Sequence, residues 1–306
     1  MDPMLVLEQA LNGVQFGVML FLMAAGLTLV FGIMDLVNLA HGSLYMVGAY
    51  LTATFARVFD SFVAGLLAAL PLTALLAIAV EVVALRALYR RDHLDQVLGT
   101  FGLILFFNEM VRIVWGPQPF FLNPPSWLAG TVAILPGVGY PAFRLAILAV
   151  GLLVALLLWL LIGRSRVGML IRAGAANREM AGALGVDIVR LYTLVFGLGA
   201  ALAGLAGAMA GPILAVQVGM GESILILTFV VIVIGGIGSI RGALAGALLV
   251  GLVDTLGRVF LPLALRGVLP PAQADGAGAS LSSMLIYIVM AAVLVWRPKG
   301  LFPAHG

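Results

Sequence analysis

Residues 11–34 read LNGVQFGVMLFLMAAGLTLVFGIM and contain no aspartate, glutamate, lysine or arginine. As an α-helix this stretch is about 36 Å long, enough to cross the ~30 Å hydrocarbon core of a bilayer. The 306-residue chain as a whole is 63% hydrophobic and 9% charged, with a mean hydropathy of +1.19. Soluble domains carry about 25% charged residues. The sequence therefore predicts a polytopic membrane protein and excludes a soluble enzyme, a nucleic-acid-binding protein and a disordered scaffold.

Further apolar stretches repeat this pattern along the chain. Those of spanning length lie at 42–59, 62–88, 94–115, 145–163, 191–217, 242–263 and 281–296. Another, 224–237, would be only about 20 Å long as a helix, and it runs into Gly235-Gly236-Ile237-Gly238-Ser239, which is too rich in glycine to continue as rigid helix. Because isolated strands cannot satisfy their backbone groups in lipid, we expect an all-α fold with eight or nine membrane-embedded segments, broken or re-entrant near 224–242.

Basic residues are concentrated in alternate connections, and the side that carries more of them is expected to be cytoplasmic. Eleven of the 16 fall on one side: Arg86, Arg90, Arg91, Arg164, Arg166, Arg172, Arg178, Arg190, Arg241, Arg297 and Lys299. The other five are Arg57, Arg112, Arg144, Arg258 and Arg266. This distribution predicts an N-terminus outside the membrane and a C-terminus in the cytoplasm. Since the basic residues are scattered at helix ends, the net charge of +3 does not indicate a nucleic-acid partner.

We expect residues 1–306 to form a single transmembrane domain with two long connections. The outer loop, 116–144, holds six of the 14 prolines, with Trp115 and Trp127 at its edges. Proline at this density stiffens a loop, and tryptophan favours the membrane interface. The loop is therefore either an interfacial flap that ties two helices together or a docking or gating surface.

The inner loop, 164–190, carries five arginines and contains a pattern typical of a short helix. Asn177 can cap its start, Met180, Ala183 and Leu184 share one side at helical spacing, and Gly185 can end it. We expect this helix to lie across the cytoplasmic mouth of the protein.

Polar residues at two breaks are candidates for a translocation pathway. Asp35, Asn38 and His41 fall between the first two spans and would share one face if that stretch were helical. They either cap helix ends or form a gate, with Gly42 beside them. The second break supplies Gly235, Gly236, Gly238 and Ser239, whose backbone groups could face a water-filled route.

Most other ionisable groups near the spans are spaced as ion pairs. Glu109 and Arg112 are three residues apart, Asp254 and Arg258 are four apart, and Glu81 is about one turn from Arg86. We expect these pairs to be structural rather than to contact substrate. Gly207/Gly211 and Gly242/Gly246 are G-x-x-x-G pairs, which favour close helix packing.

The sequence lacks the residue patterns of metal sites, phosphate-binding loops and intramembrane hydrolases. The chain has no cysteine, and His41, His93 and His305 show no metal-ligand spacing, so we expect no metal site. The single lysine, Lys299, lies between Pro298 and Gly300, so the chain has no phosphate-binding loop of the G-x-x-x-x-G-K-[S/T] type. It also lacks H-E-x-x-H and G-x-S-x-G, which argues against an intramembrane enzyme.

Four stretches resemble the LivH-type branched-chain amino-acid permeases of ABC importers. They are Gly26–Tyr50, Arg172–Gly185, Gly235–Gly251 and the tail Arg297–Phe302. Glu179, Ala181 and Gly185 also resemble the EAA-type cytoplasmic loop of importer permeases, with Met180 where the general pattern has alanine. The resemblance covers nearly the whole chain in order.

The resemblance implies a non-enzymatic permease subunit of an ATP-driven importer for branched-chain or related amino acids, located in the bacterial cytoplasmic (inner) membrane. Its partners would be a second, related permease, two cytoplasmic ATPases, an external solute-binding protein and membrane lipid. ATP and Mg would bind to the ATPases, and this chain would need no cofactor. The short helix would couple ATP hydrolysis to transport, through Asn177, Arg178, Glu179, Met180, Ala181 and Gly185.

Two alternatives stay open. A stand-alone secondary transporter or channel would explain the hydrophobicity and the broken helices equally well, and would use Asp35, Glu81 or Asp254 as a coupling site. An ABC permease for urea, amides or sugars differs only in the signature stretches. The 179–185 helix favours the driven importer, because an unaided carrier needs no docking element there.

Overall fold

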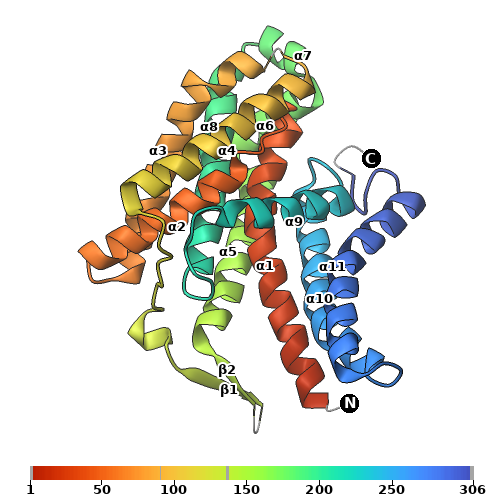
Figure 1. Ribbon diagram of the computed structural model, residues 1–306. Coiled ribbons are helices and arrows are strands. Elements are labelled where there is room, and N and C mark those ends of the chain that lie inside the picture. The colour runs from red at the N-terminus through yellow and green to blue at the C-terminus, as the bar shows by residue number, and fades with distance from the viewer. Residues whose placement is uncertain (1–2, 90, 136–137, 304–306) are drawn as a thin grey trace. The chain divides into compact units, whose positions relative to one another are not determined.

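The computed structural model describes residues 3–89, 91–135 and 138–303. Arg90, Pro136 and His305 therefore lie outside the described residues. The described chain is built of helices with one short hairpin, and it forms two compact units (Figure 1). Unit 1 comprises residues 1–24, 127–152 and 227–306, and unit 2 comprises residues 25–126 and 153–226. Three helices contribute to both units: α1 (Pro3–Met34), α5 (Ala142–Arg164) and α9 (Met220–Gly235).

Unit 2 has a core of three helices that pack against one another, α2 (His41–Val58), α3 (Phe62–Val83) and α8 (Ile188–Ala210). Small residues bring them close: a Cβ on Gly48 of α2 would lie 2.3 Å from the Cα of Gly204 on α8. Such surfaces let backbones approach where apolar lipid provides no hydrophobic drive. Around this core lie the 3₁₀ turn η1 (Leu85–Leu88), α4 (His93–Trp115), α6 (Arg166–Ala176) and α7 (Arg178–Ala183).

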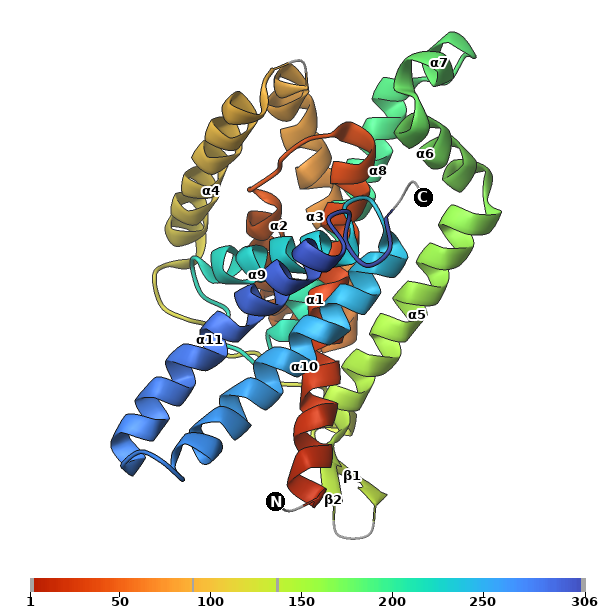
Figure 2. The same ribbon diagram turned by 90° about the vertical axis from the view of Figure 1, so that its right-hand side faces the viewer.

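Unit 1 is dominated by two helices that lie side by side, α10 (Ile240–Leu265) and α11 (Pro271–Trp296) (Figures 1 and 2). Gly278 of α11 meets Pro262 of α10, where an added Cβ would lie 2.6 Å from the proline ring. The predicted last span began at residue 281, but α11 begins ten residues earlier. Pro271 suits the first turn of a helix, since its missing N–H would have no intrahelical partner there.

Helices occupy each apolar stretch that the sequence predicted. Seven are long and apolar enough to cross a membrane: Met4–Met34, Phe62–Val83, His93–Trp115, Ala142–Arg164, Ile188–Ala210, Ile240–Leu265 and Pro271–Trp296. Of the two remaining predicted segments, α2 carries polar residues along its 18-residue length, and α9 has only 16 residues. The chain is therefore an all-helical, polytopic membrane protein with seven candidate spans among its described residues.

The loop 116–144 contains structure that the prediction of an all-α fold missed. A 3₁₀ turn, η2 (Ser126–Leu128), precedes an antiparallel hairpin of β1 (Thr131–Leu135) and β2 (Val138–Pro141). Val132 pairs with Tyr140, and Ala133 pairs with Gly139. The run Thr131-Val132-Ala133-Ile134 is rich in β-branched residues, which favour strands. Outside the bilayer core such a hairpin can leave its edges to water, so the argument against strands does not apply to it.

Candidate functional site

Helix α7 is the short helix predicted in the loop 164–190, and both of its ends are built as predicted. The side-chain Oδ1 of Asn177 accepts a hydrogen bond from the N–H of Met180 at 2.9 Å. At the other end Gly185 has φ +90°, a conformation that favours glycine. The N–H groups of Gly185 and Val186 donate to the carbonyls of Gly182 and Ala181 at 3.0 and 3.1 Å. Caps at both ends stabilise a helix of six residues that would be marginal alone.

The surface of α7 is largely free of contacts within unit 2. Ala181 is buried, whereas Arg178 and Glu179 are exposed. The apolar side chains of Met180 and Leu184 are 59% and 79% exposed. In both views α7 projects past the ends of α6 and α8, to which it is joined (Figures 1 and 2). An exposed apolar pair on a capped, projecting helix is typical of a protein-binding element.

The segment between α1 and α2 is not helical. Asp35, Asn38 and His41 were predicted to share one face only if this stretch were a helix, so that condition is not met. Residues 35–38 are irregular, and Asp35 has φ +51°, which ends α1. The alternative prediction, that these side chains cap helix ends, is also wrong for α2, whose N-cap is Ala40 without a side-chain hydrogen bond.

The segment 35–40 is instead held by α4. Gln96 Oε1 accepts a hydrogen bond from the N–H of Val37 at 3.1 Å, and the hydroxyl of Thr100 donates to the carbonyl of Val37 at 3.4 Å. Gln96 also donates to the carbonyl of Arg91 at 3.2 Å. The buried side chain of Gln96 therefore supports the irregular backbone around Val37, between the last helical hydrogen bond of α1 and the first of α2.

This arrangement separates the three predicted residues by environment. Asp35 is exposed, whereas Asn38 and His41 are completely buried. His41 lies close to α1, since a Cβ on Gly26 would be 3.0 Å from its Nε2. The Asn38 amide has no hydrogen-bond partner among the described residues. A buried amide of this kind calls for a partner such as an ordered water.

The glycine break between α9 and α10 is confirmed as a discontinuity and belongs to unit 1. Gly236 and Gly238 have φ of +104° and +82°, and the helix resumes at Ile240 with the side chain of Ser239 as its N-cap. A Cβ on Gly235 would lie 2.3 Å from the carbonyl oxygen of Gly242, so α9 and α10 are in backbone contact at the break. Gly235 and Gly236 are buried, and Gly238 and Ser239 are half-buried.

The C-terminal tail covers one side of this break. The N–H groups of Leu301 and Phe302 donate to the carbonyls of Ile234 and Gly235 at 2.8 and 2.9 Å. These carbonyls belong to the last turn of α9, which has no helical donors left for them. The tail therefore supplies the hydrogen bonds that the break removes.

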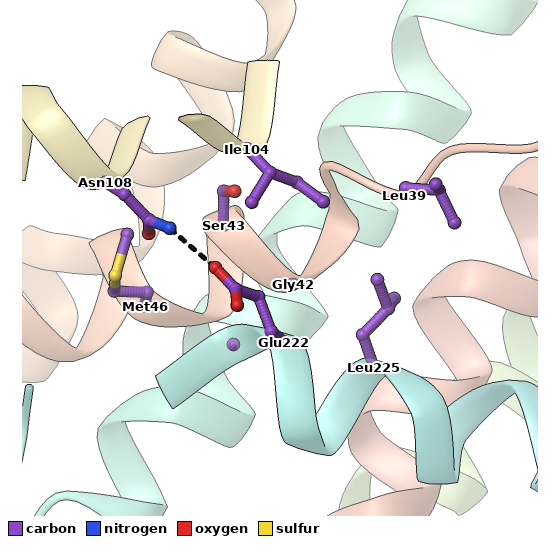
Figure 3. Close-up of a pocket in the computed structure, with 9 residues that line it drawn as sticks. Leu39, Gly42, Ser43, Met46, Ile104, Asn108, Glu222 and Leu225 are labelled. Atoms are coloured by element: carbon purple, nitrogen blue, oxygen red, sulfur yellow. Dashed lines mark hydrogen bonds between the residues drawn. The ribbon is translucent and has the colours of Figure 1, made fainter. Parts of the chain in front are cut away.

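A small recess in unit 2 brings together three helices. Gly42 and Ser43 come from α2, Ile104 and Asn108 from α4, and Gly221, Glu222 and Leu225 from α9; Leu39 and Met46 complete the lining (Figure 3). The Asn108 amide donates to the Glu222 carboxylate at 2.5 Å. A Cβ on Gly42 would lie 2.5 Å from the carbonyl oxygen of Gly221, so the backbones of α2 and α9 touch here. Of the predicted pathway residues, Gly42 is the one in this recess.

The three predicted ion pairs are present. The nitrogen–oxygen distances are 3.1 Å for Arg86–Glu81, 3.0 Å for Arg112–Glu109 and 2.9 Å for Arg258–Asp254. Glu81 is completely buried and has two further donors: the hydroxyl of Tyr89 at 2.5 Å and that of Thr193 at 2.9 Å. Burial and this hydrogen bond raise the pKa of Tyr89, and the bond to Glu81 raises the pKa of Arg86.

Sequence reasoning missed Asn108 and Glu222. They are 114 residues apart, and nothing in the spacing of either one points to the other. One signal was present: Glu222 is the single charged residue of α9, and an ionisable group in a membrane-embedded helix is a candidate functional residue.

Seven apolar helices among the described residues define a multi-pass membrane protein, and comparison with known proteins gives the family. Residues 9–294 match the family described as branched-chain amino acid transport system / permease component, and the chain belongs to that family. It is thus a multi-pass protein of the inner membrane.

Two of the relatives are similar over almost their full length, and a third is similar over part of its length. The chain is 30% identical to the high-affinity branched-chain amino acid transport system permease protein BraD of Pseudomonas aeruginosa, over 96% of this chain and 95% of that protein. It is 29% identical to the permease protein LivH of the same kind of system in Escherichia coli K12, over 96% of each chain. It is also 28% identical to LivM of Escherichia coli K12, over 92% of this chain and 67% of that protein.

Proposed function

We propose that this chain is the transmembrane permease subunit of an ATP-driven ABC importer for branched-chain or related amino acids. The observation that carries the proposal is α7, capped by Asn177, ended by Gly185 and exposing Met180 and Leu184. A carrier that works alone has no use for such a helix. An importer driven by separate ATPases needs an exposed helix that the ATPases contact, so that their conformational change is transmitted to the membrane domain.

The membrane topology that goes with this function follows the distribution of basic residues. We propose an N-terminus outside and a C-terminus in the cytoplasm, with the loop 164–190 inside and the loop 116–144 outside. Nine embedded segments, the seven candidate spans with α2 and α9, would place the termini on opposite sides. Residues 1–306 would act as one permease domain.

The partners follow from the division of labour in such importers. Similarity to both LivH and LivM, two differently named permease proteins, supports pairing with a second, related permease. Two ATPases would bind ATP and Mg and would contact Asn177, Arg178, Glu179, Met180, Ala181 and Gly185. An external solute-binding protein would select the amino acid.

The translocation pathway is proposed to include polar groups and irregular backbone at two places. One is the region of Asp35, Asn38, His41 and Gly42 in unit 2. The other is Gly235, Gly236, Gly238 and Ser239 in unit 1. Irregular backbone at membrane depth is tolerated where protein covers it or where it lines a water-filled cavity.

The coupling role is tested by Glu179→Ala and Gly185→Val in the assembled complex. The valine would be strained at φ +90° and would displace the end of α7. We expect membrane insertion and assembly to be unchanged, and leucine-stimulated ATP hydrolysis in proteoliposomes to fall by about tenfold, the effect of losing about 1.4 kcal/mol of coupling.

The matched control is Asp275→Asn, which removes another exposed acid, paired with Arg266 at 2.9 Å and distant in sequence from α7. It should leave ATP hydrolysis unchanged. Normal hydrolysis and uptake in both α7 variants would contradict the coupling role. Accumulation of leucine by the purified chain alone, driven by an ion gradient, would contradict the importer function itself.

A further inference from the structure

Glu222 lies in the first turn of α9 and is the only charged residue among the 16 of that helix. The rest of α9 is apolar apart from Ser223 and Thr228. A carboxylate in such a segment is unfavourable unless it has a partner or a function.

Three other acids in the candidate spans are paired with arginine and serve as examples of a structural carboxylate. Glu81, Glu109 and Asp254 each have an arginine within 3.1 Å. Within residues 3–89, 91–135 and 138–303, no basic side chain lies within 4.0 Å of Glu222. Its one side-chain partner there is the neutral amide of Asn108. Glu222 is exposed and lies in the first turn of α9, where the helix N-terminus favours a negative charge, and its carboxylate is open to a cation from outside this part of the chain.

The surroundings of Glu222 suit a particular kind of cation. Asn108 donates through its amide nitrogen, which leaves its Oδ1 and the second carboxylate oxygen of Glu222 as acceptors at the recess. Figure 3 shows Glu222 and Asn108 directed toward each other across the recess, with Leu225 on the same helix as Glu222. An ammonium group has three donors and no acceptor. Acceptors beside apolar side chains suit an amine that carries an aliphatic side chain, and such a ligand would have to widen the recess, which in this structure is too small to hold a water molecule.

The recess also discriminates between the two ends of an amino acid. None of the described residues that line it is basic. The carboxylate of an amino acid would meet the like charge of Glu222 there, whereas the ammonium would meet the opposite charge. Close contact of Gly42 and Gly221 keeps this acceptor pair next to the start of α2.

We propose that Glu222, oriented by Asn108, binds the ammonium group of the amino acid in transit. This inference rests on the proposed function, since it assumes that an amino acid passes through the chain. The carboxylate attracts the ammonium out of water, and the hydrogen bond from Asn108 holds the carboxylate in one orientation. A single contact of this kind is weak enough to release the substrate onward.

The first test compares ATP-driven leucine uptake by proteoliposomes that contain the whole transporter. Glu222→Gln keeps the shape of the side chain and an acceptor for Asn108 but removes the charge. We expect uptake at a leucine concentration below saturation to fall by about tenfold, as for the loss of one hydrogen bond to a charged group. Glu222→Asp should retain more activity than Glu222→Gln. Glu109→Gln, which removes an acid beside Asn108 that is already paired with Arg112, should match the wild type.

The second test uses the absence of cysteine from the chain, with cysteine-free partner subunits. Glu222→Cys provides a single thiol at the site. An anionic sulfonatoethyl methanethiosulfonate restores a negative charge and should restore uptake, whereas a cationic aminoethyl reagent should not. Excess leucine should slow the modification by either reagent. A purely structural role for Glu222 would predict neither rescue by charge nor protection by leucine.

The outcomes separate this inference from the function on which it rests. If the wild-type complex takes up neither leucine nor a related amino acid with ATP, the proposed function fails. If the wild type transports leucine and Glu222→Gln does so equally well, the ammonium contact alone is overturned. The contact is also overturned if Glu222→Gln is impaired but leucine leaves the rate of thiol modification unchanged.

Discussion

Glu81 is completely buried and accepts hydrogen bonds from Arg86, Tyr89 and Thr193. At the scale of single residues it shows how the unit tolerates a buried carboxylate. Donors on Arg86, Tyr89 and Thr193 are directed at it, and Thr193 links it to α8. Burying a charge is unfavourable without such partners, and removing the acceptor leaves the donors unsatisfied.

The first residue-scale prediction concerns stability. Glu81→Ala should reduce the free energy of unfolding by about 1–3 kcal/mol, because Arg86 and the half-buried Tyr89 and Thr193 lose the carboxylate that accepts their hydrogen bonds. Glu109→Ala removes an acid that is 60% exposed from a similar pair, and should cost at most about 1 kcal/mol. Thermal unfolding of the purified protein in detergent, followed by tryptophan fluorescence, measures both. Equal unfolding temperatures for the two variants would show that the network contributes nothing.

The residues that sequence reasoning placed correctly are those whose partners are close along the chain. Asn177 and Gly185 were predicted as the ends of a helix because capping depends on residues three or four positions away. The pair of Glu81 and Arg86 was predicted for the same reason. Thr193 was not, since it lies 112 residues beyond Glu81, and Glu222 with Asn108 was missed for the same reason. Such contacts depend on tertiary packing, which cannot be predicted from the spacing of residues along one chain.

At the scale of elements, the break between α9 and α10 shows how a helix can end within a membrane protein. The carbonyls of Ile234 and Gly235 receive donors from Leu301 and Phe302. The glycine-rich sequence predicted the break. It did not predict that the tail fills it, because that depends on the path of α10 and α11. Likewise α11 began earlier than predicted, since Gly276 and Gly278 resemble loop residues until packing is known.

The prediction at this scale concerns Gly236. Alanine there would be strained at φ +104°, and its Cβ would lie 2.8 Å from the carbonyl oxygen of Phe302. We expect Gly236→Ala to lower the unfolding temperature and to increase cleavage of the tail by carboxypeptidase. Gly276→Ala is the matched control, because no atom lies within 4 Å of its added Cβ and alanine favours a helix interior. A tail that is equally protected in both variants would contradict the packing described.

At the scale of the whole molecule, the sequence predicted the helical class and the order of the helices, and seven of the predicted segments are candidate spans among the described residues. The 42–59 segment was counted as a span on length, but α2 carries several polar side chains and is not among the seven candidate spans of the described residues. Length and composition identify helices well, because every backbone group in lipid must be satisfied locally. They do not identify helices that are shielded by protein.

The prediction at this scale concerns orientation. In the cysteine-free chain, Ala129→Cys places a thiol in the loop 116–144 and Ala183→Cys places one on α7, and both positions are exposed. In intact cells a membrane-impermeant maleimide should label the first, and it should label the second only after permeabilisation. The reverse pattern would invert the proposed topology.

The hydrogen bonds of Leu301 and Phe302 to the end of α9 also have a consequence for biosynthesis. A ribosome makes this protein from the N-terminus, so α9 and α10 enter the translocon well before the residues that complete their junction exist. Until Leu301 and Phe302 leave the exit tunnel, the carbonyls of Ile234 and Gly235 have only provisional partners. A nascent chain stalled before residue 301 therefore carries an incomplete junction, however long the stall lasts.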